Sequence, residues 1–510
     1  MIKSNEKRKV YACITSLKEI NGTIADFSLE EKEEILPLCQ QMAVEIGNTI
    51  ETSEGEETEV ISLLEKYCEE IYKIYTATES KTILYICSGI NELLAAIDQC
   101  VEKIKEIPNE ILFLPYKASM WDAMESVYQT AIKQTDCHVT VMPIPYYNVN
   151  PQGDILSVEY EGNLFPKNVV ITDIADYDFN KMRPDAIFIH NPYDQYNYVT
   201  RVASKYYSTE LVKYTNRLVY LPYFVASWNN VKAHFCLLPG VKNAWRTFVQ
   251  SESIKKIYLQ YISKKESIVA LGSPKYDKVK AVEENLSRVP REWEEILANK
   301  KIFLLNTHLH SMMNKAEERL EKLIQIFNFF HGRENIALIW RPHPLSIETA
   351  KSLNPDFTQK YLDLIEKFKN MDIGIYDESA DIHRAITVSD GYIGDTSSII
   401  PLYGVTGKPI YVLGNIINIR EKGKLIFNEE AEKKIRCSMK ENIEALQYLY
   451  FEKFISLEYY IYLIEAGKDI CAKERKEKFL NLQYGFEKEE TAGERIWNYI
   501  YQDIFGEDNV

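Results

Sequence analysis

The feature that most constrains this fold is two consecutive series of short apolar runs that alternate with helical stretches. Short apolar runs are typical of strands buried on both faces, and helices between them indicate parallel sheets covered on both sides. The first series comprises residues 111–115, 139–143, 185–190, 218–222 and 267–271, and the second comprises residues 302–306, 336–340, 373–376, 391–393 and 409–413. We therefore expect two consecutive doubly wound α/β domains.

The sequence on either side of these series has helical periodicity. Residues 1 to about 105 place apolar side chains at helical spacing, and the chain returns to helix from about residue 428. At 510 residues the chain is long enough for two or three domains. The expected boundaries are a helical region at 1–105, a first α/β domain at 106–290, a second at 291–430 and a helical segment at 431–510.

The charge balance is acidic, with 60 Lys and Arg against 75 Asp and Glu and a net charge of −15. This charge opposes binding to nucleic acid or to an anionic membrane surface, so we expect no nucleic-acid partner. No run approaches the ~20 apolar residues that span a bilayer, which predicts a cytoplasmic protein with at most peripheral contact at the inner membrane face.

Several chemical classes lack their sequence signatures in this chain. The nine cysteines form no C-x-x-C pair, which indicates reduced thiols rather than a zinc or redox site. The zinc motif H-E-x-x-H is also missing, and we expect neither a metal nor a cofactor. The absence of G-x-G-x-x-G, Walker and G-x-S-x-G motifs weakens dehydrogenase, NTPase and hydrolase interpretations.

A candidate anion site follows the expected strand at residues 391–393. Asp395, Thr396, Ser397 and Ser398 are residue types that cap helices, and Pro401 suits a first helical turn, which favours Ser397 or Ser398 as the cap. Free N–H groups, the helix dipole and hydroxyls then converge in a place suited to a phosphate. A plain helix cap would use the same bonds and is the alternative.

Two further strand ends in the second domain carry polar side chains. Thr307 and His308 follow the strand at 302–306, and Arg341 and His343 follow the strand at 336–340. Because the carboxyl ends of parallel strands share one edge of a sheet, we expect these residues to line a single anion pocket with the 395–398 segment. For His308, an ordinary surface loop is the alternative.

The first domain offers three candidates for chemistry on a substrate hydroxyl. Ser119 and Asp122 have capping-box spacing, so Asp122 is expected to act as a cap rather than a base. Glu125, one turn later, is better placed to contact substrate hydroxyls, with a solvated helix face as the alternative. His190 ends a strand and is expected at the lip of a cleft, where it suits polyol binding or ordinary loop packing.

Four segments between about residues 270 and 413 resemble the CDP-glycerol glycerophosphotransferase family, whose members are similar to teichoic acid polymerases. They are Gly272-Ser-Pro-Lys275-Tyr-Asp277, Arg341-Pro-His343-Pro, the stretch from Val388 to Ser398, and Gly407-Lys-Pro-Ile410. They occur in the order expected for the family. Each segment alone is a weak signal, and their combination carries the resemblance.

The resemblance implies a GT-B fold, with two facing Rossmann-like domains, here flanked by the N-terminal helical region and a C-terminal helical tail. It implies transfer of glycerol phosphate, or a related polyol phosphate, from CDP-glycerol or a similar CDP-polyol, with release of CMP. The acceptor hydroxyl would belong to a polyol, a glycan or a lipid-linked molecule in cell-surface polymer synthesis. The residues implied to bind the donor phosphates are Arg341, His343, Asp395, Thr396, Ser397 and Ser398, with His308 beside them.

The chain departs from this family in its first domain. The family's tryptophan-histidine-glycine-threonine stretch, the source of its base, has no counterpart, and the substitutes are His190, Glu125 and Asp122, in that order. Two other interpretations stay open: a GT-B glycosyltransferase or epimerase that uses a UDP-sugar, and a non-catalytic scaffold paralogue. The oligomeric state is also open, with a homo-oligomer among the alternatives.

Overall fold

The computed structural model describes most of the 510-residue chain, and every structural statement below concerns these residues. The described residues are 1–150, 152–197, 199–226, 231–280, 289–307, 316–343, 346–347, 350, 355–379, 381–395, 397–413, 448–452, 454–481 and 489–506. They divide into two compact units. The smaller unit comprises residues 1–111, 131–139 and 497–510, and the larger comprises residues 112–130 and 140–496.

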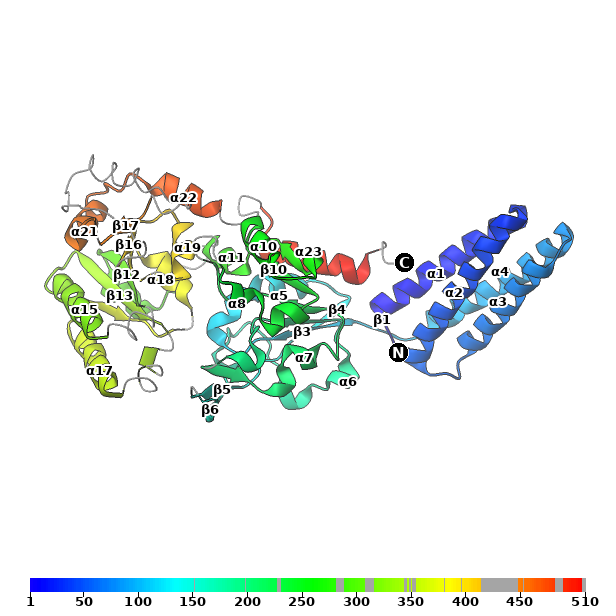
Figure 1. Cartoon of the computed structure of the whole chain (residues 1–510), viewed down its shortest axis with the longest axis horizontal. Coiled ribbons are helices and arrows are strands. Elements are labelled where there is room, and N and C mark those ends of the chain that lie inside the picture. Colours follow the sequence, from blue (N-terminus) through cyan, green and yellow to red (C-terminus); the bar gives the residue numbers. More distant parts are fainter. Residues whose placement is uncertain are drawn as a thin grey trace. The chain divides into compact units, whose positions relative to one another are not determined.

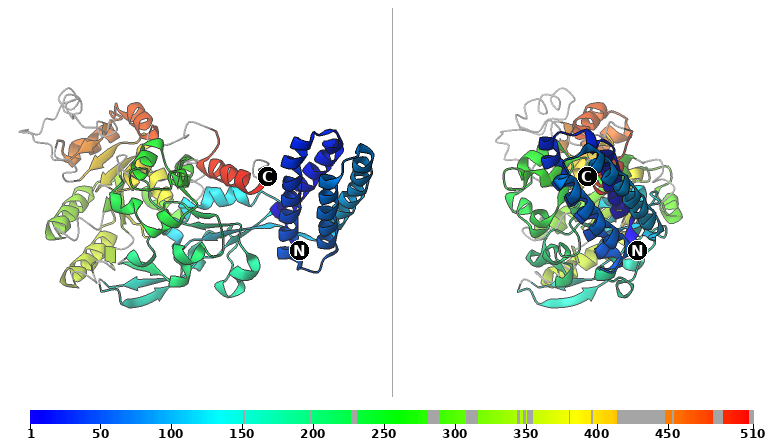
Figure 2. Two further views of the ribbon diagram at one scale, coloured as in Figure 1. Left: turned by 45° about the vertical axis from the view of Figure 1, so that its right-hand side comes forward. Right: turned by 90° about the vertical axis from the view of Figure 1, so that its right-hand side faces the viewer.

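The smaller unit is built on helices whose apolar stripes face one another. Figures 1 and 2 both show the blue helices side by side: α1 (Ser4–Thr23), α2 (Leu29–Glu54), α3 (Glu59–Thr76) and α4 (Ser80–Lys103). Ser28 starts α2 through a capping box with Glu31. Apolar residues from all of these helices form one buried core. The helical periodicity of the N-terminal sequence therefore has its origin in a helical bundle.

A short parallel sheet and the end of the C-terminal helix also belong to the smaller unit. Strand β1 (Ile2–Lys3) pairs in parallel with β2 (Glu106–Ile107). The last turns of helix α23 (Ala492–Phe505) contact α1, since the Arg8 guanidinium lies 4.7 Å from the Phe505 ring centroid. The same guanidinium forms a 2.7 Å ion pair with the Asp136 carboxylate. Tyr501 donates a 2.8 Å hydrogen bond to the same carboxylate.

The first α/β domain contains a six-stranded sheet with the order β11-β10-β9-β7-β3-β4. Its strands are β3 (Asn109–Leu114), β4 (Cys137–Val141), β7 (Ala186–Ile189), β9 (Leu218–Tyr220), β10 (Arg246–Val249) and β11 (Ile268–Ala270). In chain order this corresponds to a flavodoxin-like arrangement, whose topological switch point lies between β3 and β7. Ligands of such sheets bind beyond the carboxyl ends of the strands at this point.

Short helices connect these strands. They are η2 (Ala118–Ala123), α5 (Glu125–Ala131), α6 (Phe179–Met182), α7 (Ser208–Leu211), α8 (Ala233–Cys236), α9 (Pro239–Asn243), α10 (Glu252–Tyr258) and α11 (Pro274–Lys280). A small antiparallel sheet, which we did not predict, is formed by β5 (Tyr146–Val149), β6 (Ile155–Glu159) and β8 (Thr200–Val202).

The second α/β domain contains a parallel sheet with the order β14-β13-β12-β15-β16-β17. Its strands are β12 (Lys301–Thr307), β13 (Ile336–Pro342), β14 (Gly374–Tyr376), β15 (Gly391–Gly394), β16 (Ile410–Val412) and β17 (Tyr450–Phe451). Numbered within the domain, this is the 3-2-1-4-5-6 order of the Rossmann fold, with its switch point between β12 and β15.

Helices cover both faces of this sheet. They are α13 (Arg291–Leu297), α15 (Ala316–Phe330), α17 (Pro355–Asn370), α18 (Ile382–Val388), α19 (Ile399–Gly404), α21 (Leu457–Glu465) and α22 (Ala472–Leu480). Alternate strand residues enter different cores, since Phe303 and Trp340 pack in one cluster while Leu304 and Ile339 pack in another. Burial on both faces explains why the strands appear in the sequence as continuous apolar runs.

The predicted fold class is confirmed: the chain is an α/β protein with two Rossmann-like domains, an N-terminal helical region and helices at its C-terminal end. Predicted strands differ from the observed ones by a few residues, as at residues 139–143, where β4 spans Cys137–Val141. Among the described helices, none combines the length and the apolar character that crossing a bilayer requires.

Candidate functional site

A cavity of about 760 Å³ opens between the two α/β domains of the larger unit. The first domain contributes residues from η2, α5, α11 and the segment after β6, and the second contributes residues around the start of α18. The wall consists of Ala118, Ser119, Trp121, Asp122, Glu125, Glu161, Leu164, Phe165, Pro166, Lys167, Asn168, Lys278, Glu378, Ser379, Asp381, His383 and Arg384. Because η2 follows β3 and α18 follows β14, the cavity lies beyond carboxyl ends of strands in both sheets.

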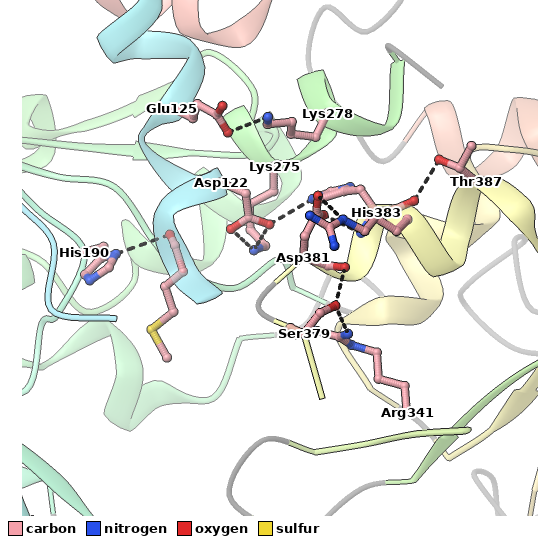
Figure 3. Close-up of polar contacts among 12 residues, drawn as sticks. Asp122, Glu125, His190, Lys275, Lys278, Arg341, Ser379, Asp381, His383 and Thr387 are labelled. Atoms are coloured by element: carbon pink, nitrogen blue, oxygen red, sulfur yellow. Dashed lines mark hydrogen bonds and ion pairs between the residues drawn. The ribbon is translucent and has the colours of Figure 1, made fainter. Parts of the chain in front are cut away.

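Asp122 is the centre of the buried polar network in this wall (Figure 3). Lys275 donates to both of its carboxylate oxygens, at 2.5 and 2.6 Å, and the His383 Nε2 atom lies 3.1 Å from Oδ2. Burial alone raises the pKa of Asp122, but the Lys275 ammonium and the His383 hydrogen bond outweigh it and hold this pKa below its usual range. Asp122 is therefore an ionised carboxylate that binds two partners.

This finding corrects the expected role of Asp122 as a helix cap. Helix η2 is preceded by Lys117, and no side chain caps its first turn. The Ser119–Asp122 spacing fits a capping box, but a buried ammonium and an imidazole compete for the same carboxylate. Charge-assisted bonds to these partners are stronger than a bond to a neutral N–H group, so the carboxylate turns toward them.

His383 is a site residue that the sequence analysis missed. It lies in the first turn of α18, where its N–H donates a 2.9 Å hydrogen bond to the Asp381 carboxylate that caps the helix. The residue is 3% exposed, and its Nδ1 atom has no hydrogen-bond partner among the described residues. The hydrogen bond to Asp122 assigns the proton to Nε2, which leaves a lone pair on Nδ1. Such an imidazole can accept a proton while the carboxylate stabilises the resulting charge.

Glu125 lies in the same wall, three residues beyond Asp122. Its carboxylate forms a 2.5 Å ion pair with Lys278, and the residue is buried. Lys275 and Lys278 are three residues apart on α11 and therefore project from the same face of the helix. One helix thus positions the ammonium groups that bind both acidic side chains.

Helix α11 begins within the Gly272–Asp277 segment, which the sequence analysis used only as part of a resemblance. Gly272 has a φ of +95°, a conformation that favours glycine. Asp277 accepts hydrogen bonds from the Ser126 hydroxyl at 2.6 Å and from the N–H groups of Ala492 and Gly493. Asp277 therefore fixes α11 against neighbouring elements, and Lys275 of the same helix supplies the ammonium group that binds Asp122.

The predicted anion pocket requires the Arg341 side chain to face the 395–398 segment. In the structure it binds residues of another loop instead. Its guanidinium forms a buried ion pair with Asp377 and donates to the Ser379 carbonyl at 2.6 Å and the Ser379 hydroxyl at 3.3 Å. The register explains this choice, because Trp340 pairs with Tyr376 and so places Asp377 beside Arg341 at the next position. Arg341 therefore holds the loop that leads from β14 to His383 (Figure 3).

Asp395 is likewise engaged within the protein rather than open to a donor. Its carboxylate forms an ion pair with Arg319 of α15, and both side chains are largely buried. A carboxylate repels a phosphate unless a cation neutralises it, and this ion pair supplies the neutralisation. The structure therefore revises Asp395 from a direct donor ligand to a residue that fixes its loop.

Ser397 and Ser398 lie at the switch point between β12 and β15, and His343 follows the neighbouring β13. The Asn306 amide donates to the Arg341 carbonyl and its Oδ1 accepts from the Ser397 hydroxyl at 3.1 Å, which joins three strand ends. The Ser397 hydroxyl also accepts a 3.2 Å hydrogen bond from the N–H of Ile399, the first residue of α19. Ser398 precedes α19 without a side-chain cap bond, and the His343 N–H donates to the Thr307 carbonyl. His308 and Thr396 lie outside the described residues.

Gly394 shows why the backbone can approach closely at this switch point. A Cβ atom on Gly394 would lie 2.4 Å from the Asn306 carbonyl oxygen, closer than non-bonded atoms allow. The absence of a side chain lets β15 end directly against β12.

His190 lies in the core of the first domain and not at the lip of a cleft. It is fully buried, its Nε2 accepts a 3.0 Å hydrogen bond from Tyr116 N–H, and its Nδ1 lies 3.4 Å from the Met120 carbonyl. Burial lowers the pKa of His190 to about 3, so the imidazole is neutral. Both nitrogens are engaged, and this residue is a structural link between β7 and η2 rather than a base.

Comparison with known proteins gives a distant structural likeness. No protein family matches the chain, and no curated protein matches it. Solved structures similar to it include S. aureus MnaA with UDP, at 13% identity and a TM-score of 0.45, covering 78% of this chain and 97% of that one. Another is UDP-GlcNAc 2-epimerase from Neisseria meningitidis, at 13% identity and a TM-score of 0.45, covering 77% of this chain and 100% of that one.

The structural neighbours also include the wall teichoic acid polymerase TagF. One TagF structure has 12% identity and a TM-score of 0.43, and the match covers 87% of this chain and 98% of that one.

Proposed function

We propose that this protein is a transferase that moves glycerol phosphate, or a related polyol phosphate, from CDP-glycerol to an acceptor hydroxyl, with release of CMP. The observation that carries the proposal is the buried Asp122–His383 pair in the wall of a cavity beyond the carboxyl ends of two Rossmann-like sheets. The family resemblance of the segments between residues 270 and 413 supplies the donor class.

The donor diphosphate binds at the switch point of the second sheet. Rossmann-like sheets bind nucleotides beyond the strand ends at this point, where Ser397 and Ser398 follow β15. His343, at the end of the neighbouring β13, adds a donor group. These residues hold the phosphates through hydroxyl, imidazole and backbone N–H groups.

His383 acts as the general base in this proposal. Its Nδ1 atom takes the proton of the acceptor hydroxyl as that oxygen forms a bond to the β-phosphorus of CDP-glycerol. The bond between this phosphorus and the oxygen of CMP breaks, and CMP leaves with the bonding electrons. Asp122 stabilises the imidazolium through Nε2. His383 thus takes the place of His190, the first candidate from the sequence, as the proposed base.

Calorimetric titration with CDP-glycerol, CMP and a UDP-sugar tests the donor assignment. The proposal predicts binding of both cytidine compounds and a weaker response to the UDP-sugar. Ser398→Ala should weaken CDP-glycerol binding, whereas the matched change Ser204→Ala, remote from the second sheet, should leave it unchanged. Tight binding of the UDP-sugar with no response to cytidine compounds would support a glycosyltransferase or epimerase instead.

A further inference from the structure

We propose that the cavity between the two α/β domains binds a neutral polyhydroxylated acceptor, a sugar or a polyol, in preference to an acceptor that carries a phosphate at this position. The inference rests on the proposed function and names the acceptor class for the same site.

The wall of the cavity has no surplus of positive charge. It contains five carboxylates, from Asp122, Glu125, Glu161, Glu378 and Asp381, against the cations of Lys167, Lys278 and Arg384, and the Asp122 charge is already neutralised by Lys275 behind the wall. Glu125 pairs with Lys278 at 2.5 Å, and Asp381 pairs with Arg384 at 3.7 Å. Within the described part of the wall, Lys167 alone is a cation without an ion pair.

This charge distribution disfavours a phosphate in the cavity. A phosphomonoester carries a charge of about −1.5 to −2 at neutral pH and requires compensating cations. Lys278 and Arg384 would have to leave their carboxylate partners to supply this charge. The separated carboxylates would then lie uncompensated beside the ligand, and each would repel it.

A ligand with several hydroxyl groups matches the wall better. Glu378 is an exposed carboxylate that no described cation pairs with, and a carboxylate accepts hydrogen bonds from hydroxyls. Ser119, Ser379 and Asn168 add side chains that both donate and accept. Hydroxyls of a sugar or polyol also donate and accept, so they pair with this mixed wall without separating an ion pair.

Two buried polar atoms in the wall also point to a ligand. The His383 Nδ1 atom and the Trp121 indole N–H lack hydrogen-bond partners among the described residues, and the two residues are 3% and 2% exposed. Buried polar atoms are usually paired, so unpaired ones in a cavity wall call for a partner. One is an acceptor and the other a donor, and a hydroxyl group can satisfy either. The 760 Å³ volume accommodates a ligand of sugar size.

Binding of matched ligand pairs to the full chain, without any donor nucleotide, tests this inference. The probes are glucose against glucose 6-phosphate and glycerol against glycerol 3-phosphate, with dissociation constants measured by saturation-transfer NMR titration at low salt. We expect the neutral member of at least one pair to bind about tenfold more tightly, a ratio that narrows as salt screens the repulsion. Equal or tighter binding of the phosphorylated member, or no binding by either member of both pairs, overturns the inference.

A charge reversal links the selectivity to this wall. Glu378→Lys, at an exposed position, should lower the ratio of the dissociation constants of the phosphorylated and neutral ligands severalfold. Glu321→Lys, on the exposed face of α15, should leave this ratio unchanged. Equal effects of the two variants would contradict the assignment. The readout is independent of CMP release: selective binding without CMP release would refute the proposed function alone, and CMP release with tighter phosphate binding would refute only the acceptor class.

Discussion

Asp122 and His383 are 261 residues apart in the chain, and a 3.1 Å hydrogen bond joins the carboxylate of one to the imidazole of the other. The carboxylate comes from the helix that follows β3, and the imidazole comes from the helix that follows β14. Their contact links the carboxyl ends of two separate sheets in the wall of one cavity. It also orients the imidazole so that one nitrogen stays available for proton transfer.

The Asp122 carboxylate is expected to stabilise the fold as well as the site. Asp122→Asn removes the counter-charge of the buried Lys275 ammonium, so we expect the free energy of unfolding to fall by about 3–5 kcal/mol. Urea denaturation measures this change. The exposed Asp363→Asn is the matched control and should leave stability within about 0.5 kcal/mol of the wild type.

A double variant separates the charge from the packing at this position. Asp122→Asn with Lys275→Met removes both charges, and we expect it to recover part of the lost stability because no buried charge is left unpaired. If the single variant were as stable as the wild type, the buried ion pair would not have the structural role described here.

Arg341 is expected to act as a positioning residue for the loop at 377–381. Arg341→Lys keeps the charge but loses the forked contact with Asp377 and Ser379, which should cost about 1–3 kcal/mol. Hydrogen exchange of residues 377–388 should become faster, and CMP release should slow without a change in CDP-glycerol binding. The exposed Arg291→Lys is the control, and a loss of donor binding in Arg341→Lys would restore Arg341 as a donor ligand.

His190 gives the fold a specific sensitivity to acid. Its pKa is lowered to about 3 in the native state, whereas an unfolded histidine titrates near ~6.5. Between these pH values only the unfolded chain takes up the proton. The contribution of neutral His190 to stability is therefore complete above pH ~6.5 and is lost as the pH falls toward 3. The loss is about 1.4 kcal/mol per pH unit. The slope of unfolding free energy against pH measures this loss.

The variant His190→Gln should have a flatter slope in the same pH window, because glutamine keeps an acceptor for Tyr116 N–H but does not titrate. The exposed His331→Gln should keep the wild-type slope. An unchanged slope in His190→Gln would show that other groups control the acid response.

Ser397 and Ser398 are expected to differ in role. The Ser397 hydroxyl donates to Asn306 and accepts from Ile399 N–H, so Ser397→Ala should lower stability by about 1 kcal/mol. Ser398 has no side-chain cap bond, so Ser398→Ala should leave the melting temperature unchanged while weakening CDP-glycerol binding. Thermal melts and calorimetric titrations separate the two effects. Equal losses of stability in both variants would indicate that Ser398, like Ser397, stabilises the fold and would contradict its role in donor binding.

The sheet architecture was predictable because it depends on local signals. Phe303, Leu304 and Leu305 are buried on alternating faces of β12, which produces a continuous apolar run, and parallel pairing then fixes which strand ends meet. Asn306 pairs in this register with Arg341 on one side and with Gly394 on the other, so these strand ends lie along one edge of the sheet. The antiparallel sheet of β5, β6 and β8 carries exposed apolar residues and gave no comparable pattern.

The directions of the site side chains were not predictable, because each depends on a partner distant in sequence. Arg341 follows a strand end like a phosphate ligand, but Asp377 at the end of the adjacent strand captures it. Asp122 has the spacing of a cap, but Lys275 lies 153 residues later and binds it. His383 carried one usable signal, its position in the first turn of the helix that follows a strand, and nothing local indicated its bond to Asp122.

The most direct test is the rate of CMP release from CDP-glycerol, followed by chromatography, for the wild type, His383→Gln and the exposed control His331→Gln. We predict that glutamine preserves the contact with Asp122 but slows CMP release by about 10²-fold or more, while the control behaves as the wild type. A wild-type rate of CMP release in His383→Gln, or no CMP release by the wild type with any acceptor, would contradict the proposed role of His383.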